Sequence, residues 1–241
     1  MAAAAYRLPA MDMDFLLGDT TRGLRFQLEY QKAEEFLRKW GVATTVIVFG
    51  SARIKPGEAG GWYESAREFA RICSEEGGAK LRNEHPRHNV IATGGGPGIM
   101  EAANRGADDA GAPSIGFNIT LPLEQEPNAY STPDLTFRFH YFAMRKMHFA
   151  IRAAALVVFP GGFGTMDELF EILTLRQTGK MDDNLSVVLY DSKFWKSLIN
   201  FQTFVDAGMV RQADLDLFGF ADSPREAWDE LVKRGLNVVK E

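Results

Sequence analysis

A glycine-rich turn between a buried strand and a helix is the feature that most constrains the fold of this chain. The turn is residues 160–168, PGGFGTMDE. It follows the apolar run 153–159, typical of a buried strand, and precedes helically spaced apolar residues over 169–175. Glycine lets a ligand approach the bare backbone, and the free amides and dipole of a helix start favour an anion. The turn therefore predicts a phosphate cradle with a carboxylate, Glu168, one turn inside the helix.

The same residues also fit a purely structural alternative. Thr165-x-x-Glu168 is a capping box, in which Thr165 would cap the helix and Glu168 would reach back to the cap amide. The spacing of this segment alone leaves the two interpretations open.

Two further turns follow predicted strands of the same kind. The β-branched run 44–49 ends in Gly50-Ser51-Ala52-Arg53, and the strand predicted over 89–92 runs into residues 93–101, TGGGPGIME. Ser51 is expected to contact a ligand, and Pro97 suits the first turn of the following helix. Because parallel strands end at one edge of a sheet, we expect the loops to meet at the topological switch point. Neither glycine loop has a Walker sequence or a clean dinucleotide pattern.

The rest of the chain also alternates between helices and strands. The whole pattern predicts an α/β fold with a doubly wound, mainly parallel sheet and helices on both faces. We expect residues 1–20 to form a mobile arm and residues 21–241 to form a single nucleotide-binding domain. The other helices are expected over 21–40, 62–76, 141–152, 193–207 and from Pro224 onward, and the other strands over 114–117, 137–140, 185–190 and 215–220.

Composition limits the class of protein. The chain has 241 residues and a formal net charge of −5 with both signs scattered, which argues against a nucleic-acid partner. Its single cysteine, Cys73, excludes a disulfide framework and is expected to pack as a small apolar residue. The N-terminal segment lacks the basic start of a signal peptide, and no apolar run approaches the roughly 20 residues of a membrane span. We therefore expect a cytoplasmic protein with no membrane partner.

The helix predicted over 141–152 carries cations near the expected crevice. Arg145 and Lys146 lie near its start and cannot face the same way, so we expect one of them to reach the crevice. His140 and His148 lack the partner spacing of a metal site and are expected to be surface or helix-end histidines. No metal is predicted.

These motifs together resemble those of a known family. Residues 160–168 fit the PGGxGTxxE signature of the Lonely Guy (LOG) family, residues 93–102 resemble its other glycine loop, and Gly50-Ser51-Ala52 resembles its first turn. Arg145-Lys146, 23 residues before Glu168, resembles its Arg-Lys pair. The resemblance covers roughly residues 46–232. The N-terminal arm and the loop 77–87 make the chain more similar to a longer bacterial-type subgroup than to the short members.

The resemblance implies a Rossmann-like fold, a homo-oligomer (a dimer or higher assembly) and phosphoribohydrolase activity without a cofactor. Such enzymes cut the N-glycosidic bond of a nucleoside 5′-monophosphate and release the free base and ribose 5-phosphate. AMP and cytokinin nucleotides are the usual substrates in the family.

The resemblance also implies roles for single residues. Glu168 would be the catalytic carboxylate, stabilising the positive charge that develops on the ribose and activating water, and Arg145 would be the essential cation. Asp167, rotated by about 100° around the helix, is expected to be a solvated acid of the first turn. The substrate-binding residues would be Ser51, Gly94, Gly95, Gly96, Lys146, Gly161, Gly162, Gly164 and Thr165.

Two other functions are open at this point. The same cradle would serve a nucleotide- or cofactor-carrier protein that hydrolyses nothing. Many members of the family also carry the old label "lysine decarboxylase", and amino-acid decarboxylation would need a lysine that holds pyridoxal phosphate. Lys146 is the only candidate near the predicted site.

Overall fold

A seven-stranded parallel sheet forms the centre of the chain. The computed structural model describes residues 3–58, 60–80, 85–121, 126–181 and 185–239. Within them, the strand order is β4-β3-β2-β1-β5-β6-β7, and every neighbouring pair is parallel. The α/β class and the doubly wound sheet are confirmed. The strands are β1 (Thr45–Phe49), β2 (Val90–Thr93), β3 (Ser114–Ile119), β4 (Thr136–Phe139), β5 (Ala153–Val158), β6 (Ser186–Tyr190) and β7 (Gly219–Ala221).

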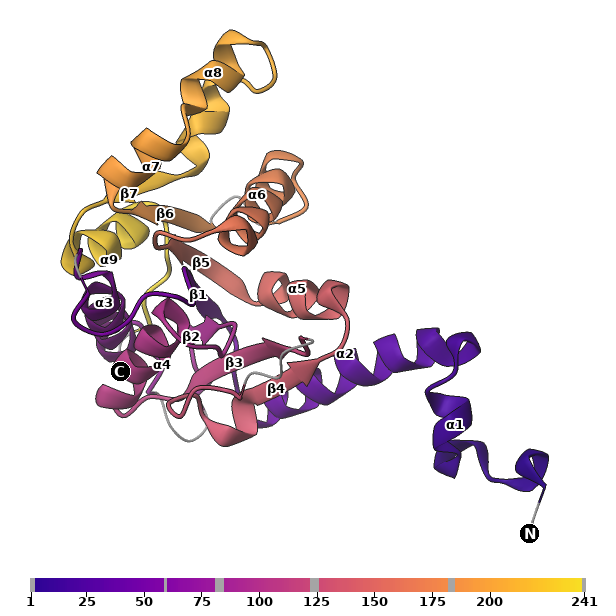
Figure 1. The fold of residues 1–241 in the computed structure, drawn as a ribbon. Coiled ribbons are helices and arrows are strands. Elements are labelled where there is room, and N and C mark those ends of the chain that lie inside the picture. The colour runs from indigo at the N-terminus through magenta and orange to yellow at the C-terminus, as the bar shows by residue number, and fades with distance from the viewer. Residues whose placement is uncertain (1–2, 59, 81–84, 122–125, 182–184, 240–241) are drawn as a thin grey trace.

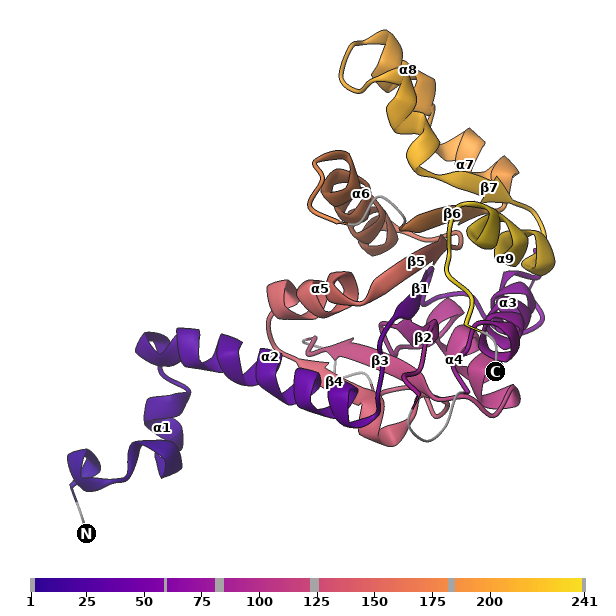
Figure 2. The same cartoon turned by 180° about the vertical axis from the view of Figure 1, so that it is seen from behind.

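Helices cover both faces of this sheet (Figures 1 and 2). On one face lie α3 (Trp62–Glu76), α4 (Ile99–Asp109) and α9 (Pro224–Lys233). On the other lie α2 (Arg22–Lys39), α5 (Phe142–Ile151), α6 (Phe163–Gln177) and α7 (Ser192–Leu198). Two hydrophobic cores result, one on each face of the sheet.

The strands are apolar along their whole length because both of their faces are covered. In β1, Val46 and Val48 pack into the core beneath α3 and α4, whereas Ile47 and Phe49 pack into the opposite core. None of these four side chains is more than 3% exposed. Successive side chains of a strand point to opposite faces, so a continuous apolar run supplies both cores.

The strand order sets the position of the functional loops. From β1 the chain moves outward through β2, β3 and β4, and it then returns to place β5 on the other side of β1. The direction of winding therefore reverses between β1 and β5. The turns that follow β1, β2 and β5 all lie at the carboxyl edge of the sheet beside this switch point.

Three local expectations are wrong. The helix expected over 193–207 is two helices, α7 and α8 (Phe201–Asp206), because Ile199 is extended between them, with φ −132° and ψ 119°. Residues Gln212–Leu217 form a 3-10 helix, which leaves only three residues for β7. Pro97 precedes the first turn of α4, which begins at Ile99 with Gly98 as its N-cap.

Cys73 and His148 are both buried in the protein interior. Cys73 is fully buried as a small apolar residue, as predicted. His148 lies in the last turn of α5, as the helix-end prediction has it, but it is only 1% exposed, so it is not a surface residue. Its imidazole stacks on Tyr30 with ring centroids 5.4 Å apart, and desolvation by burial lowers the pKa of His148. The aromatic surroundings favour the neutral ring.

Residues 3–20 form short helices at the N-terminal end, including α1 (Met13–Leu16), and extend away from the sheet together with the first part of α2 (Figures 1 and 2). Arg25 on α2 holds this segment, since its Nη1 donates to the carbonyls of Leu16 and Gly18 at 2.8 and 2.7 Å. The mobility expected for residues 1–20 stays a prediction, and Met1 and Ala2 lie outside the described residues.

None of the helices within the described ranges is long and apolar enough to cross a membrane. The cytoplasmic location stays a prediction.

A buried ion pair joins α2 to the start of β5. The carboxylate of Glu34 accepts hydrogen bonds from Arg152 Nη1 and Nη2 at 2.8 and 2.9 Å, and the side chains are only 7% and 11% exposed. This bidentate bond to Arg152 is the main reason that the pKa of Glu34 falls to about 2.

We predict that Glu34→Gln lowers the free energy of unfolding by about 3 kcal/mol, because Arg152 keeps its charge in a buried position. The lowered pKa means that Glu34 stabilises the fold above its ordinary value of 4.5, and that this contribution is lost as the pH falls towards 2. Urea unfolding between pH 2 and pH 7 should therefore show that the free energy of unfolding falls less steeply with decreasing pH in the variant than in wild type. Glu35→Gln, at an exposed position of the same helix, is the control and should behave as wild type.

Candidate active site

Main-chain hydrogen bonds join the three turns at the switch point. The Ser51 N–H donates to the carbonyl of Pro160 at 3.0 Å, and the Ile99 N–H donates to the carbonyl of Ser51 at 3.1 Å. Gly98 makes this approach possible, since its φ is +71° and a Cβ there would lie 2.9 Å from the Ala52 Cα. The turns therefore meet at one rim, as predicted.

A cleft of about 710 Å³ opens at this rim. That volume suits a small-molecule ligand. Its walls combine bare backbone from the three turns with the side chains of Arg145 and Glu168. The predicted residues that line it are Ser51, Gly94, Gly96, Arg145, Gly161, Gly162, Gly164, Thr165 and Glu168.

Arg145 and Glu168 form a buried ion pair inside the cleft. Arg145 Nη1 lies 3.2 Å from Glu168 Oε1, with the two side chains 10% and 13% exposed. The guanidinium is held from behind, because its Nε donates to the carbonyl of Phe117 at 2.7 Å. It also needs a glycine in the loop, since a Cβ at Gly94 would lie 2.6 Å from its Nη2.

Burial controls the charge state of this pair. Desolvation raises the pKa of Glu168 to about 7, although Arg145 and Lys146 act in the opposite direction. Desolvation also lowers the pKa of Arg145. The carboxyl group of Glu168 therefore gains and loses a proton near neutral pH, which suits a group that exchanges protons with a substrate.

The start of α6 decides between the two interpretations of residues 165–168. The helix begins at Phe163 with Gly162 as its N-cap, and no side chain caps it. Thr165 is therefore inside the first turn, and the Glu168 carboxylate faces Arg145. The capping-box alternative is wrong, because the helix begins three residues earlier than that pattern requires. The start of the helix is left without a side-chain cap beside the cleft.

The structure separates the Arg-Lys pair. Arg145 faces the cleft, whereas Lys146 Nζ lies on the outer side, 2.8 Å from Asp167 and 2.9 Å from Glu171. Burial would lower the pKa of Lys146, but hydrogen bonds to these two carboxylates outweigh it and raise the pKa. Asp167 is 58% exposed. Lys146 does not line the cleft, and neither does Gly95.

Several residues of the cleft were not selected from the sequence. Asn118 near the end of β3 is one, since it belongs to none of the sequence motifs. Glu126 is another, in the long segment between β3 and β4, and segments of that length are often functional. The other unselected residues are apolar or backbone contributors, which carry no motif: Gly50, Ala52, Met100, Ile119, Leu121, Phe142, Phe163, Met166 and Leu198, together with Arg53 of the first turn.

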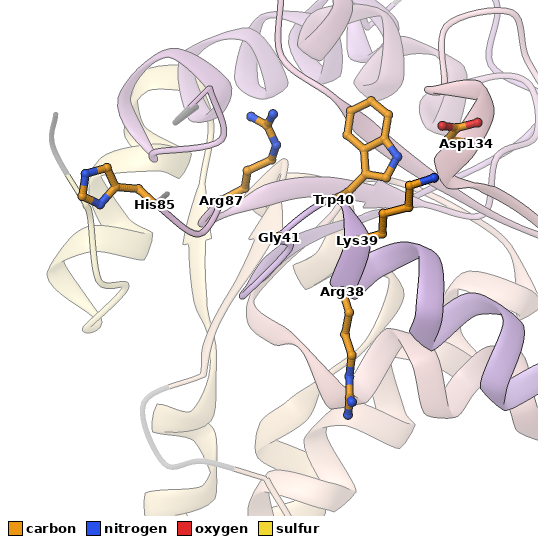
Figure 3. Close-up of a pocket in the computed structure, with 7 residues that line it drawn as sticks. All are labelled: Arg38, Lys39, Trp40, Gly41, His85, Arg87 and Asp134. Atoms are coloured by element: carbon orange, nitrogen blue, oxygen red, sulfur yellow. The ribbon is translucent and has the colours of Figure 1, made fainter. Parts of the chain in front are cut away.

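A second, cationic pocket of about 400 Å³ lies at the opposite edge of the sheet, before β1 and β2 (Figure 3). Arg38 points away from the other labelled side chains there, and its Nε donates to Glu34 at 2.6 Å. Arg87 lies over the Trp40 ring and donates to the carbonyl of Ala79. These cations already have protein partners, so this pocket is a weaker candidate than the cleft.

Comparison with known proteins agrees with this geometry. The family model described as "Possible lysine decarboxylase" matches residues 100–231, more than half of the chain. The chain belongs to this family, the LOG family. It is similar to "Probable cytokinin riboside 5'-monophosphate phosphoribohydrolase LOG4" of Oryza sativa subsp. japonica, 26% identical over 147 residues, which are 60% of this chain and 63% of that protein. It is also 25% identical over 176 residues to "Cytokinin riboside 5'-monophosphate phosphoribohydrolase LOG3" of Arabidopsis thaliana, covering 66% of this chain and 80% of that one.

Solved structures support the fold of this LOG-family chain. The crystal structure of TM1055 superposes with a TM-score of 0.54 at 19% identity, covering 79% of this chain and 99% of that one. The molybdenum cofactor binding protein of Rippkaea orientalis gives a TM-score of 0.52 at 19% identity, with 79% and 94% covered. The Rossmann-like fold is thereby confirmed.

The raised pKa of Glu168 predicts how stability changes with pH. Its folded-state value lies above the ordinary 4.5, so its contribution to stability is complete below pH 4.5 and is lost as the pH rises towards 7. Glu168→Gln removes this titration. Thermal unfolding at pH 5 and pH 8 should therefore show a smaller loss of Tm between these pH values in Glu168→Gln than in wild type, by roughly 2–4 °C for each kcal/mol. Asp167→Asn, next to it but exposed, should keep the wild-type difference. An unchanged difference in Glu168→Gln would contradict the raised pKa.

Proposed function

We propose that this chain hydrolyses the N-glycosidic bond of a nucleoside 5′-monophosphate, either AMP or a cytokinin nucleotide, to a free base and ribose 5-phosphate. The observation that carries the proposal is the buried Arg145–Glu168 pair in a cleft walled by glycine loops. The names of the related plant proteins support the same reaction class.

The substrate phosphate binds at the start of α6. Gly161, Gly162 and Gly164 offer main-chain amides, Thr165 offers a hydroxyl, and the helix dipole favours the anion. No acidic residue occupies the first turn of α6 to compete for these donors. Ser51, Gly94 and Gly96 also line the cleft, where the ribose phosphate fits close to bare backbone.

Glu168 acts at the anomeric carbon. As the C1′–N bond breaks, positive charge develops on the ribose ring, and a neighbouring carboxylate stabilises it. Glu168 takes a proton from the attacking water, whose oxygen bonds to C1′. The base leaves with the electron pair of the broken bond and then receives that proton. A pKa of about 7 suits both steps at neutral pH. Arg145 holds Glu168 and the anionic groups of the substrate.

Release of adenine from AMP tests the two central roles. Glu168→Gln should reduce kcat at least about 10³-fold, and Arg145→Ala should reduce it about 10²-fold or more, since each removes an interaction that is strongest in the transition state. Liquid chromatography measures the free adenine, and Asp167→Asn is the matched control with expected wild-type turnover. Wild-type turnover in Glu168→Gln would reject the proposed role.

The same measurement separates the carrier alternative. A wild-type chain that binds AMP but releases no adenine would be a carrier using the cradle without hydrolysis. Decarboxylation receives no support from the site, because Lys146 is engaged by two carboxylates outside the cleft.

We also propose that the chain forms a homo-oligomer through α5 and α6. Five large apolar side chains on these helices are exposed: Phe142, Met147, Ile151, Phe163 and Phe170. Lys146 lies on the same surface as Asp167 and Glu171, so a second copy related by a two-fold axis would present complementary charges.

Light scattering should therefore give a multiple of the chain mass of 26.8 kDa. Ile151→Asp, which places a charge on this surface away from the cleft, should shift the protein towards the monomer. Val232→Asp on α9, at an exposed position of the opposite face, should not. An Ile151→Asp protein of unchanged mass would place the interface elsewhere.

A further inference from the structure

The segment that precedes β4 grips the glycine loop through Asn128. The Asn128 N–H donates to the carbonyl of Gly95 at 2.8 Å, and its Nδ2 donates to the carbonyl of Gly96 at 3.0 Å. Its Oδ1 accepts from the N–H groups of Tyr130 and Ser131 at 3.1 and 3.2 Å. Asn128 therefore holds two successive carbonyls of the loop, that of Gly95 through its main chain and that of Gly96 through its side chain.

A buried polar network supports this grip. Asn104 on α4 is fully buried, and its Oδ1 accepts from Thr93 Oγ1 at 2.7 Å and from Asn128 Nδ2 at 3.0 Å. Its Nδ2 donates to Ser114 Oγ at 2.9 Å. Thr93 Oγ1 in turn accepts from the Gly95 N–H at 2.9 Å. Such a satisfied network holds a single arrangement, because any rotation would leave a buried polar atom without a partner.

Asn118 on β3 completes a clamp on the loop carbonyls. With its amide oriented to satisfy its neighbours, its nitrogen donates to the carbonyls of Gly94 and Gly95 at 2.6 and 3.2 Å. A trans peptide points its N–H opposite to its C=O. The Gly95 carbonyl faces Asn118 and Asn128, so the N–H of Gly96 points the other way, and Gly96 lines the cleft.

We infer that Asn128 is a positioning residue: its side chain holds the Gly96 carbonyl while its main chain holds the Gly95 carbonyl, and together these bonds fix Gly96 so that its N–H donates to an oxygen of the bound nucleoside monophosphate. The identity of the ligand rests on the proposed function. Rotation of the Gly95–Gly96 peptide would turn a carbonyl oxygen towards the anion, and repulsion would replace a hydrogen bond. Asn128 itself lies outside the set of residues that line the cleft.

Asn128→Asp tests the inference by exchanging only the amide donor. The carboxylate can still accept from Tyr130 and Ser131, but it meets the oxygens of Gly96 and Asn104 without a donor. Asn89→Asp is the matched control at the other end of β2. Asn89 is fully buried, whereas Asn128 is half-buried, and like Asn128 it donates two hydrogen bonds from Nδ2, here to the carbonyls of Gly77 and Asn237 at 2.9 and 2.8 Å.

Calorimetric titration with AMP and the Tm are measured for wild type and both variants. We expect the Kd of Asn128→Asp to rise about tenfold, which corresponds to about 1.4 kcal/mol, while Asn89→Asp loses Tm and keeps the wild-type Kd. Asn128→Ala, which adds no charge, should also weaken binding and serves if Asn128→Asp does not fold.

Three results would overturn the inference. They are an unchanged Kd in the Asn128 variants, an equal rise of Kd in Asn89→Asp, and a wild-type chain that does not bind AMP. These results can be told apart from a failure of the proposed hydrolysis. If the wild-type chain binds AMP but releases no adenine, the Kd values of the Asn128 variants for AMP still test the role of Asn128.

Discussion

The contact between Arg145 and Glu168 is the interaction on which the site depends. Two charges are costly to bury, and they persist here because the guanidinium has further fixed partners. It donates to the carbonyl of Phe117 and lies over the ring of Phe149. Burial then keeps the pKa of Glu168 near neutrality, so the feature that costs stability also prepares a carboxyl for proton exchange.

The parallel sheet makes this contact possible by bringing distant segments together. Phe117 belongs to β3, Arg145 to α5, which follows β4, and Glu168 to α6, which follows β5. The Ser51 N–H donates to the turn after β5, and the Ser51 carbonyl accepts a hydrogen bond from the segment that follows β2. The cleft wall therefore combines bare backbone with charged and apolar side chains, and the backbone amides suit a phosphate.

Side-chain amides give the glycine loop its definite shape. A run of three glycines has little conformational preference of its own. Asn104, Asn118 and Asn128 supply that preference by binding its carbonyls and its supporting threonine. In the same way, Glu34 and Arg152 fix α2 against the amino edge of the sheet, far from the cleft.

Much of the fold could be predicted from the sequence, because the strands carry long apolar runs and the helices carry clear stop signals. The helix expected over 62–76 has those bounds in the structure, and α9 begins after the cap Ser223 at Pro224. The segment 193–220 could not be predicted in detail. Trp195 anchors α7 in the core, whereas α8 has no buried residue, so packing and not spacing decides where the helix breaks.

For the site, residue types and spacing were enough to predict the chemical parts: two glycine loops, a carboxylate at a helix start and an Arg-Lys pair. Those parts follow from residue type and local spacing, which any chain segment carries with it. Only the tertiary structure decided that Arg145 faces the cleft while Lys146 faces outward, that Glu168 is paired instead of capping α6, and that Asn118 and Asn128 belong to the site. Each of these depends on the direction of a side chain relative to elements that are remote in sequence, and no local pattern contains that information.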